Sequence, residues 1–201
     1  MRNFTSIIFV LCLGSLSTCA SSDFKFDTPP RDYDNLEISL DRSSCYGACP
    51  SYVVKVSGDG NVSYCGFTDV EEQGRRTRQI NPDDVRSLYD QILAADFFNL
   101  DDEYFANITD GPSYHVSVSV DGQTKAVRDY FGQEAGMPES VTVIQDVIDD
   151  IAGTSAWIGN PPNYSHLGAV SYHIPDCEDE FRPGAKAFRK RLDEIITLDS
   201  K

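Results

Sequence analysis

Residues 113–120 read SYHVSVSV, a strict alternation of apolar and polar side chains. Successive side chains point to opposite faces only in an extended chain, because a strand has a side-chain period of two residues. The stretch is therefore predicted to be a half-buried β-strand. Its apolar face consists of Tyr114, Val116, Val118 and Val120. Asp121-Gly122 then favours a turn into QTKAVRDYF, so a β-hairpin is expected.

The same alternation predicts a second hairpin and a first strand before it. The first strand has Leu36, Ile38 and Leu40 on one face, and the next strand has Tyr52, Val54 and Val56. Gly58-Asp59-Gly60 is predicted to turn the chain into NVSYCGF, where Val62 and Tyr64 continue the apolar face. A further, polar strand is expected from Arg75 to Ile80.

Two helices are predicted from capping signals and apolar periodicity. Asn81-Pro82-Asp83-Asp84 is typical of a helix start, since Asn caps free N–H groups and Pro suits the first helical position. A second helix is expected after Pro138 and before Gly153. The predicted inner faces are Val85, Leu88, Tyr89, Ile92 and Leu93, and then Val141, Ile144, Val147, Ile148 and Ile151. Trp157 is expected to close the core, and residues 97–112 are expected to be irregular.

These elements together predict an α+β fold, a mainly antiparallel sheet of β-hairpins packed against two helices. The expected organisation is a signal peptide at 1–20, a linker at 21–35, the α+β domain at 36–158 and a C-terminal extension at 159–201. A helix is expected in that extension from about Ala185 to Leu198.

The N-terminus has one positive charge, an apolar run of about ten residues and then small residues, which is typical of a secretory signal peptide. Two interpretations of its end compete. Thr18-Cys19-Ala20 suits cleavage before Ser21, whereas Leu16-Ser17-Thr18-Cys19 resembles a lipobox that would make Cys19 a lipid-modified first residue. Either one predicts export, to the periplasm or to an outer-membrane anchor of a Gram-negative bacterium.

The chain carries a formal net charge of −15, with 17 Lys and Arg against 32 Asp and Glu. Such a charge repels nucleic acid and anionic lipid headgroups, so a nucleic-acid partner is not expected. The expected partner is an envelope protein or a small ligand, with a membrane tether only through a lipidated N-terminus.

Cys45 and Cys49 are predicted to form a disulfide across a tight loop. Residues four apart in a strand are separated by about 13 Å, far more than the roughly 3.8 Å between the Cβ atoms of a cystine, so the pair must lie in a turn. Gly47 permits such a turn because glycine accepts positive φ. A redox pair would need a helix after the nucleophile, but Pro50 and a strand pattern follow Cys49. A copper site would combine the pair with His115, His166 or His173, none at diagnostic spacing.

Cys65 is predicted to lie on the outer sheet face, opposite Val62 and Tyr64. An unpaired exposed thiol is a liability outside the cell. Four cysteines outside the export segment allow three connectivities, of which we expect Cys65 to pair with Cys177 and to hold the C-terminal extension on the sheet. Neither a metal site nor a cofactor is predicted.

Acidic residues gather in the stretch before the 113–120 strand, and they mark a candidate contact surface. Its members are Asp101, Asp102, Glu103 and Asp110, with His115 on the polar strand face. Ser113 is not in a nucleophile elbow, so a hydrolase is not favoured, although paired-carboxylate chemistry stays open.

The order of these motifs resembles a bacterial domain of unknown function, family 6438, found in exported proteins and lipoproteins. The residues that carry the resemblance are 45–50 (CYGACP) with Tyr52, 58–60, Tyr64, 94–98, 109–110 and 127–130. The resemblance covers about 36–157 and implies one exported domain, but no activity. Cys65 stands where the family more often has glycine, and the extension after Trp157 lies outside it.

The sequence as a whole favours an exported, disulfide-stabilised binding or interaction domain without enzymatic activity. The alternative is an envelope thiol-redox or copper-binding protein that uses the C-x-x-x-C pair.

Overall fold

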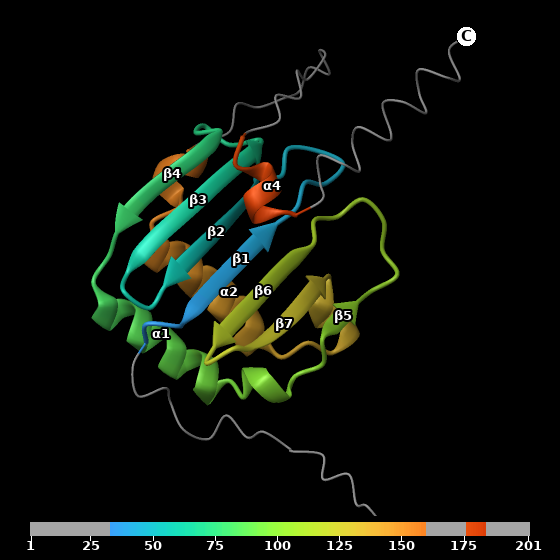
Figure 1. Cartoon of the computed structure of the whole chain (residues 1–201). Coiled ribbons are helices and arrows are strands. Elements are labelled where there is room, and N and C mark those ends of the chain that lie inside the picture. The colour runs from blue at the N-terminus through green and yellow to red at the C-terminus, as the bar shows by residue number, and fades with distance from the viewer. Residues whose placement is uncertain (1–32, 160–175, 184–201) are drawn as a thin grey trace, which may run out of the picture.

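A single seven-stranded sheet organises the chain, in the order β4-β3-β2-β1-β6-β7-β5 (Figure 1). The computed structural model describes residues 33–159 and 176–183. The strands are β1 (Glu37–Arg42), β2 (Ser51–Ser57), β3 (Asn61–Thr68), β4 (Gly74–Gln79), β5 (Glu103–Phe105), β6 (Tyr114–Val120) and β7 (Gln123–Tyr130). Neighbours are antiparallel except β5 and β7, which are parallel. The predicted α+β class is confirmed.

Strand β1 joins the two hairpins into one sheet. It pairs with β2 on one side and with β6 on the other, so Ile38 lies opposite both Val56 and Val118. These three side chains are fully buried. The register therefore follows from the alternation, because a slip of one residue would turn every apolar side chain toward water.

Two long helices cover one face of the sheet, which we call the inner face. They are α1 (Pro82–Ala94) and α2 (Glu139–Ala152), and the short elements are α3 (Ser155–Ile158), α4 (Glu178–Phe181) and the 3-10 turns η1 (Phe97–Asn99) and η2 (Gly132–Ala135). Asn81 caps α1 as predicted, since its side-chain oxygen accepts the Asp83 N–H at 3.1 Å. Helix α2 ends at Gly153, which has a φ of 65°.

The core lies between the inner face and the two helices. Val85, Leu88 and Ile92 of α1 are fully buried in it, as are Val141 and Ile148 of α2. Trp157 closes the core as predicted, with its ring centroid 5.0 Å from that of Tyr64.

The expectation that residues 97–112 are irregular was wrong in part, because this stretch contains η1 and β5. Strand β5 joins the sheet edge through hydrogen bonds from Arg128 N–H to Asp102 O (2.8 Å) and from Ala106 N–H to Tyr130 O (3.0 Å). A three-residue strand is too short for alternation to reveal it, and its partner β7 lies elsewhere in the sequence.

Helix α4 lies on the opposite, outer face of the sheet (Figure 1). Phe181 of α4 and Cys177 pack with Val53, Cys65 and Phe67 in a small apolar cluster. Arg182 fixes the segment further, because its Nε donates to Asp41 Oδ2 at 3.0 Å and its guanidinium lies 4.0 Å from the Phe67 ring centroid. The helix expected at 185–198 lies outside the described residues. Among the residues that are described, no helix has the length and apolar character needed to cross a bilayer.

Candidate functional site

The C-x-x-x-C motif forms a disulfide-closed loop in front of β2. Cys45 and Cys49 are bonded, with their Cα atoms 5.5 Å apart, and Gly47 has a φ of 153°. The chain continues from Pro50 into β2, so no helix N-terminus is present to lower a thiol pKa. The loop is also tied to residues 106–113, since the Tyr46 N–H donates to Asp110 O at 3.0 Å. Tyr46 itself projects from the loop, 87% exposed.

The second disulfide joins Cys65 of β3 to Cys177, the pairing expected from the sequence. Cys65 lies on the outer face, but both residues are buried by the segment that the bond holds in place. The two disulfides indicate an oxidising, extracellular environment. Cys19, His166 and His173 lie outside the described residues. Within the described part of the chain, no group of three or more His, Cys, Asp and Glu side chains is arranged to hold a metal ion.

The structure brings only part of the predicted contact surface together. Asp102 and Glu103 form ion pairs with Lys125 and Arg128 of β7. Asp110 lies beside the disulfide loop, where it adopts a φ of 71°. Asp101 is exposed next to Asp102.

His115 lies on the outer face, between Asp41 of β1 and Arg128 of β7. Arg128 lies opposite Glu103, so of the predicted acidic residues Glu103 is close enough for its charge to act on His115. Desolvation by its neighbours lowers the pKa of the His115 imidazole, against the opposing charge of Asp41. Its surroundings therefore favour a neutral strand residue.

A row of polar and aromatic side chains, which was not predicted from the sequence, crosses one end of the inner face. The strand register places Tyr52, Arg42, Tyr114 and Asp129 side by side on β2, β1, β6 and β7. We call these four residues the end row. Each of the four residues occupies an inward-facing position at the end of its strand. A polar residue at such a position is the feature of the sequence from which the end row could have been predicted.

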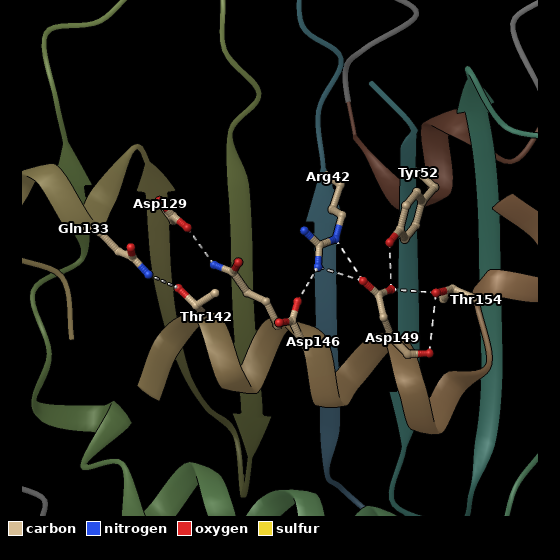
Figure 2. A network of polar contacts seen from close by, with 9 residues as sticks. Arg42, Tyr52, Asp129, Gln133, Thr142, Asp146, Asp149 and Thr154 are labelled. Carbon is tan, nitrogen blue, oxygen red and sulfur yellow. Dashed lines mark hydrogen bonds and ion pairs between the residues drawn. The ribbon is translucent and has the colours of Figure 1, made fainter. Parts of the chain in front are cut away.

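Helix α2 presents polar side chains to the end row (Figure 2). Gln145 bonds to Asp129, and Asp146 and Asp149 pair with Arg42. Thr142, one turn before Gln145 and Asp146, accepts a hydrogen bond from Gln133 of η2 beside the row. The spacing of three or four residues places these α2 side chains along one side of the helix, beside its apolar face. A polar seam thus runs between α2 and the strand ends.

Asp149 is the centre of the seam at the Tyr52 end. Its carboxylate accepts hydrogen bonds from Tyr52 Oη (2.7 Å), Thr154 Oγ1 (2.8 Å) and Arg42 Nε (2.9 Å). Burial and the adjacent Asp149 charge raise the pKa of the Tyr52 hydroxyl. Burial lowers the pKa of Arg42, but the charge and hydrogen bond of Asp149 together with the Tyr52 and Tyr114 hydroxyls outweigh burial, and the net shift is upward. At this end the negative charge is compensated, so the arrangement is a structural ion pair.

At the other end of the seam the structure has a pocket of ≈ 270 Å³ between the end of β7, the η2 turn and α2. Its lining residues are Pro112, Tyr114, Asp129, Phe131, Gly132, Gln133, Glu134, Thr142 and Gln145. Asp129 and Gln145 are 7% and 2% exposed. The pocket therefore combines a buried carboxylate and amide with aromatic walls, as ligand sites commonly do.

Neutral groups hold Asp129 in place. One carboxylate oxygen accepts the Gly132 N–H at 2.8 Å, and the other accepts Gln145 Nε2 at 2.9 Å. Gln133 and Thr142, which also line the pocket, are joined by a hydrogen bond of 3.2 Å. Glu134 adds a second carboxylate at the exposed side of the pocket.

Phe131 stands at the pocket wall in a strained backbone conformation. Its φ of 51° lies in the left-handed region, which a bulky side chain rarely adopts. The ring lies against Gly111, where an added Cβ would come within 2.1 Å of it. Backbone strain of this kind is concentrated at functional sites. The conformation of Phe131 is therefore a second indication, beside the buried Asp129 carboxylate, of a ligand site in this pocket.

Comparison with known proteins places the chain in a family. The model of a family described as Domain of unknown function (DUF6438) matches residues 36–152, which include the disulfide loop, the end row and α2. No curated protein is significantly similar to the chain. The match covers more than half of the sequence, and the chain therefore belongs to the DUF6438 family.

Proposed function

We propose that this protein is an exported, disulfide-stabilised binding domain without enzymatic activity, and that the pocket beside Asp129 is its ligand site. The observation that carries the proposal is the pocket itself, where the buried Asp129 carboxylate meets an aromatic wall that contains the strained Phe131. Structural strain and a buried charge both cost stability. A binding role accounts for both at one place.

The nature of the lining residues supports binding over catalysis. The lining side chains include two carboxylates, amides and the Thr142 hydroxyl, but no Ser, Cys, His or Lys. The Thr142 oxygen accepts a hydrogen bond from the Gln133 side-chain amide, which cannot take its proton. An activated nucleophile would need a base within hydrogen-bonding reach.

An apolar rim beside the pocket supports a partner or ligand larger than the pocket. Phe105, Ile108 and Phe131 are 51%, 41% and 39% exposed. Phe105 stacks on Tyr130 at 5.0 Å, and Tyr130 packs edge-on against Phe131 at 5.2 Å. Aromatic side chains of this kind are enriched where proteins bind partners.

The Cys45–Cys49 disulfide, which we call the clasp, supports the proposed site indirectly. It fixes the loop that holds residues 106–113 through the Tyr46 to Asp110 hydrogen bond, and Pro112 of that segment lines the pocket. The clasp therefore positions one wall of the site.

Binding is tested by NMR titration of the full chain, with both disulfides formed, against small probes of four classes: ammonium or guanidinium compounds, carboxylates, neutral alcohols and saccharides. We expect at least one class to shift the Gly132 amide and the Gln145 side-chain amide signals. Shifts in no class, or shifts only at residues remote from the pocket, would refute it as the ligand site.

Export is tested separately by expressing the full chain in a Gram-negative host and measuring the mass of its N-terminal peptide. A mature chain that begins at Ser21, or at a lipid-modified Cys19, supports periplasmic or outer-membrane placement respectively. A chain that keeps residues 1–20 and stays in the cytosol contradicts it.

A further inference from the structure

The pocket contains negative charge that nothing in the described structure neutralises. Asp129 and Glu134 line it, and neither forms an ion pair with any Lys or Arg of the described residues. We propose that the pocket takes a cationic nitrogen group, an ammonium or a guanidinium. This inference rests on the proposed function, since it names the chemistry of the ligand that the pocket binds.

The hydrogen bonding of Asp129 leaves room for such a group. An ionised carboxylate offers about four lone-pair sites, and Asp129 uses one site on each oxygen, for Gly132 N–H and Gln145 Nε2. Both donors are neutral, so they orient the carboxylate without cancelling its charge. A buried charge without a counter-charge is costly, and a bound cation removes that cost.

The aromatic walls suit the same chemistry. Cations bind over aromatic faces, and Tyr114 already holds one, because the Arg42 guanidinium lies 4.5 Å from its ring centroid. Arg42 is committed to Asp149 through its Nε. Arg42 is therefore not available to the pocket carboxylates, and the cation that we propose is that of a ligand.

Size and overall charge narrow the ligand further. The volume of ≈ 270 Å³ is below the roughly 300 to 1,000 Å³ of pockets for drug-sized ligands, so the group has the size of a single side chain or a small free amine. The net charge of −15 attracts cations to the whole molecule. It cannot by itself select this pocket, which is why the test needs a charge-matched control.

The competing explanation is that Asp129 only caps the η2 turn through Gly132. In that case Asp129→Asn, which keeps the shape and an acceptor oxygen, leaves the probe affinity unchanged. A second alternative is an anion attracted by the N-terminal end of α2. The test includes an anionic probe for this reason.

The experiment titrates the full chain with n-butylammonium, N-methylguanidinium, butyrate and 1-butanol, and follows the Gly132 and Gln145 signals by NMR. A blocked tripeptide with a central lysine is a further probe. The control variant is Asp150→Asn on the exposed side of α2, which changes the net charge equally. Circular dichroism confirms folding of each variant, and Glu134→Gln, at an exposed residue, keeps the test informative if Asp129→Asn does not fold.

We expect one of the cations to bind and the butyrate and butanol of equal size not to bind. Asp129→Asn should weaken cation binding at least tenfold and Glu134→Gln about threefold, with Asp150→Asn unchanged. Tighter binding of the peptide assigns the cation to a protein side chain, and tighter binding of the free amine assigns it to a small molecule. Equal affinity in Asp129→Asn and the parent chain, or preferential binding of butyrate or butanol, would overturn the inference while leaving the pocket a binding site.

Discussion

Replacing Asp149 by alanine should destabilise the fold strongly, although Asp149 lies in the last turn of a helix. A negative charge at that position is unfavourable toward the helix dipole, so only its contacts can justify it. Its carboxylate accepts hydrogen bonds from Tyr52, Thr154 and Arg42, and its side chain is 18% exposed.

The magnitude follows from what the substitution leaves behind. The Arg42 guanidinium, 16% exposed, would keep Asp146 at 3.6 Å as its one carboxylate partner among the described residues. The Tyr52 hydroxyl would lose its carboxylate acceptor. Breaking one partner of a buried ion pair costs about 3 to 5 kcal/mol. Arg42 keeps some solvent and its contact with the Tyr114 ring, so we expect a loss of about 3 kcal/mol in the free energy of unfolding.

Urea denaturation at pH 7 measures this loss, with Asp150→Ala as the matched control. Asp150 is the next residue of α2 and is exposed, so its removal should change the free energy of unfolding by less than about 0.5 kcal/mol. Unfolding free energies within about 1 kcal/mol of each other for the two variants would refute the view that the seam is a stabilising ion pair.

Three further predictions use the same equilibrium measurement. Tyr64 Oη is buried without a hydrogen-bond partner among the described residues, so Tyr64→Phe should leave stability unchanged or raise it, whereas Tyr52→Phe should lower it by about 1 to 2 kcal/mol. Burial raises the pKa of the Tyr52 and Tyr64 hydroxyls above the ordinary 10.0, so these tyrosines ionise first in the unfolded state. The free energy of unfolding should therefore be intact below pH 10 and should fall above it by about 1.4 kcal/mol per pH unit for each tyrosine. The fall should be shallower in either Phe variant. Removing the Cys65–Cys177 bond, which joins residues 112 positions apart, should lower the free energy of unfolding by about 5 kcal/mol. Removing the Cys45–Cys49 bond should lower it by only about 2 kcal/mol, because a shorter loop restricts the unfolded chain less. Equal losses would contradict this chain-entropy argument.

Most of the fold could be predicted because its signals are local. Alternation identified β1, β2, β3, β6 and β7, and the Asn81 cap and Gly153 bounded the two long helices. Strand β5 could not be found, because its three residues are held by hydrogen bonds to β7 and not by a pattern of their own.

The pocket could not be predicted because it depends on contacts between distant residues. On the sequence, Gln145 is an ordinary polar position beside the apolar stripe of a predicted helix, and Asp129 lies within the strand predicted at 123–131. Only the packing of α2 across the strand ends brings Gln145 Nε2 to Asp129. The acidic stretch at 101–110 attracted attention by composition, but Asp102 and Glu103 are occupied by Lys125 and Arg128.

The two ends of the polar seam differ in charge, and this difference carries the functional argument. At one end Asp149 meets Arg42, and the pair needs nothing more. At the other end Asp129 has only amide donors, although it lies next to Tyr114 in the same end row. If the seam served stability alone, an arginine beside Asp129 would be the expected solution, because a paired buried charge is less costly than an unpaired one. The pocket lies where such an arginine would be, and a cationic ligand bound there would neutralise Asp129 as Arg42 neutralises Asp149.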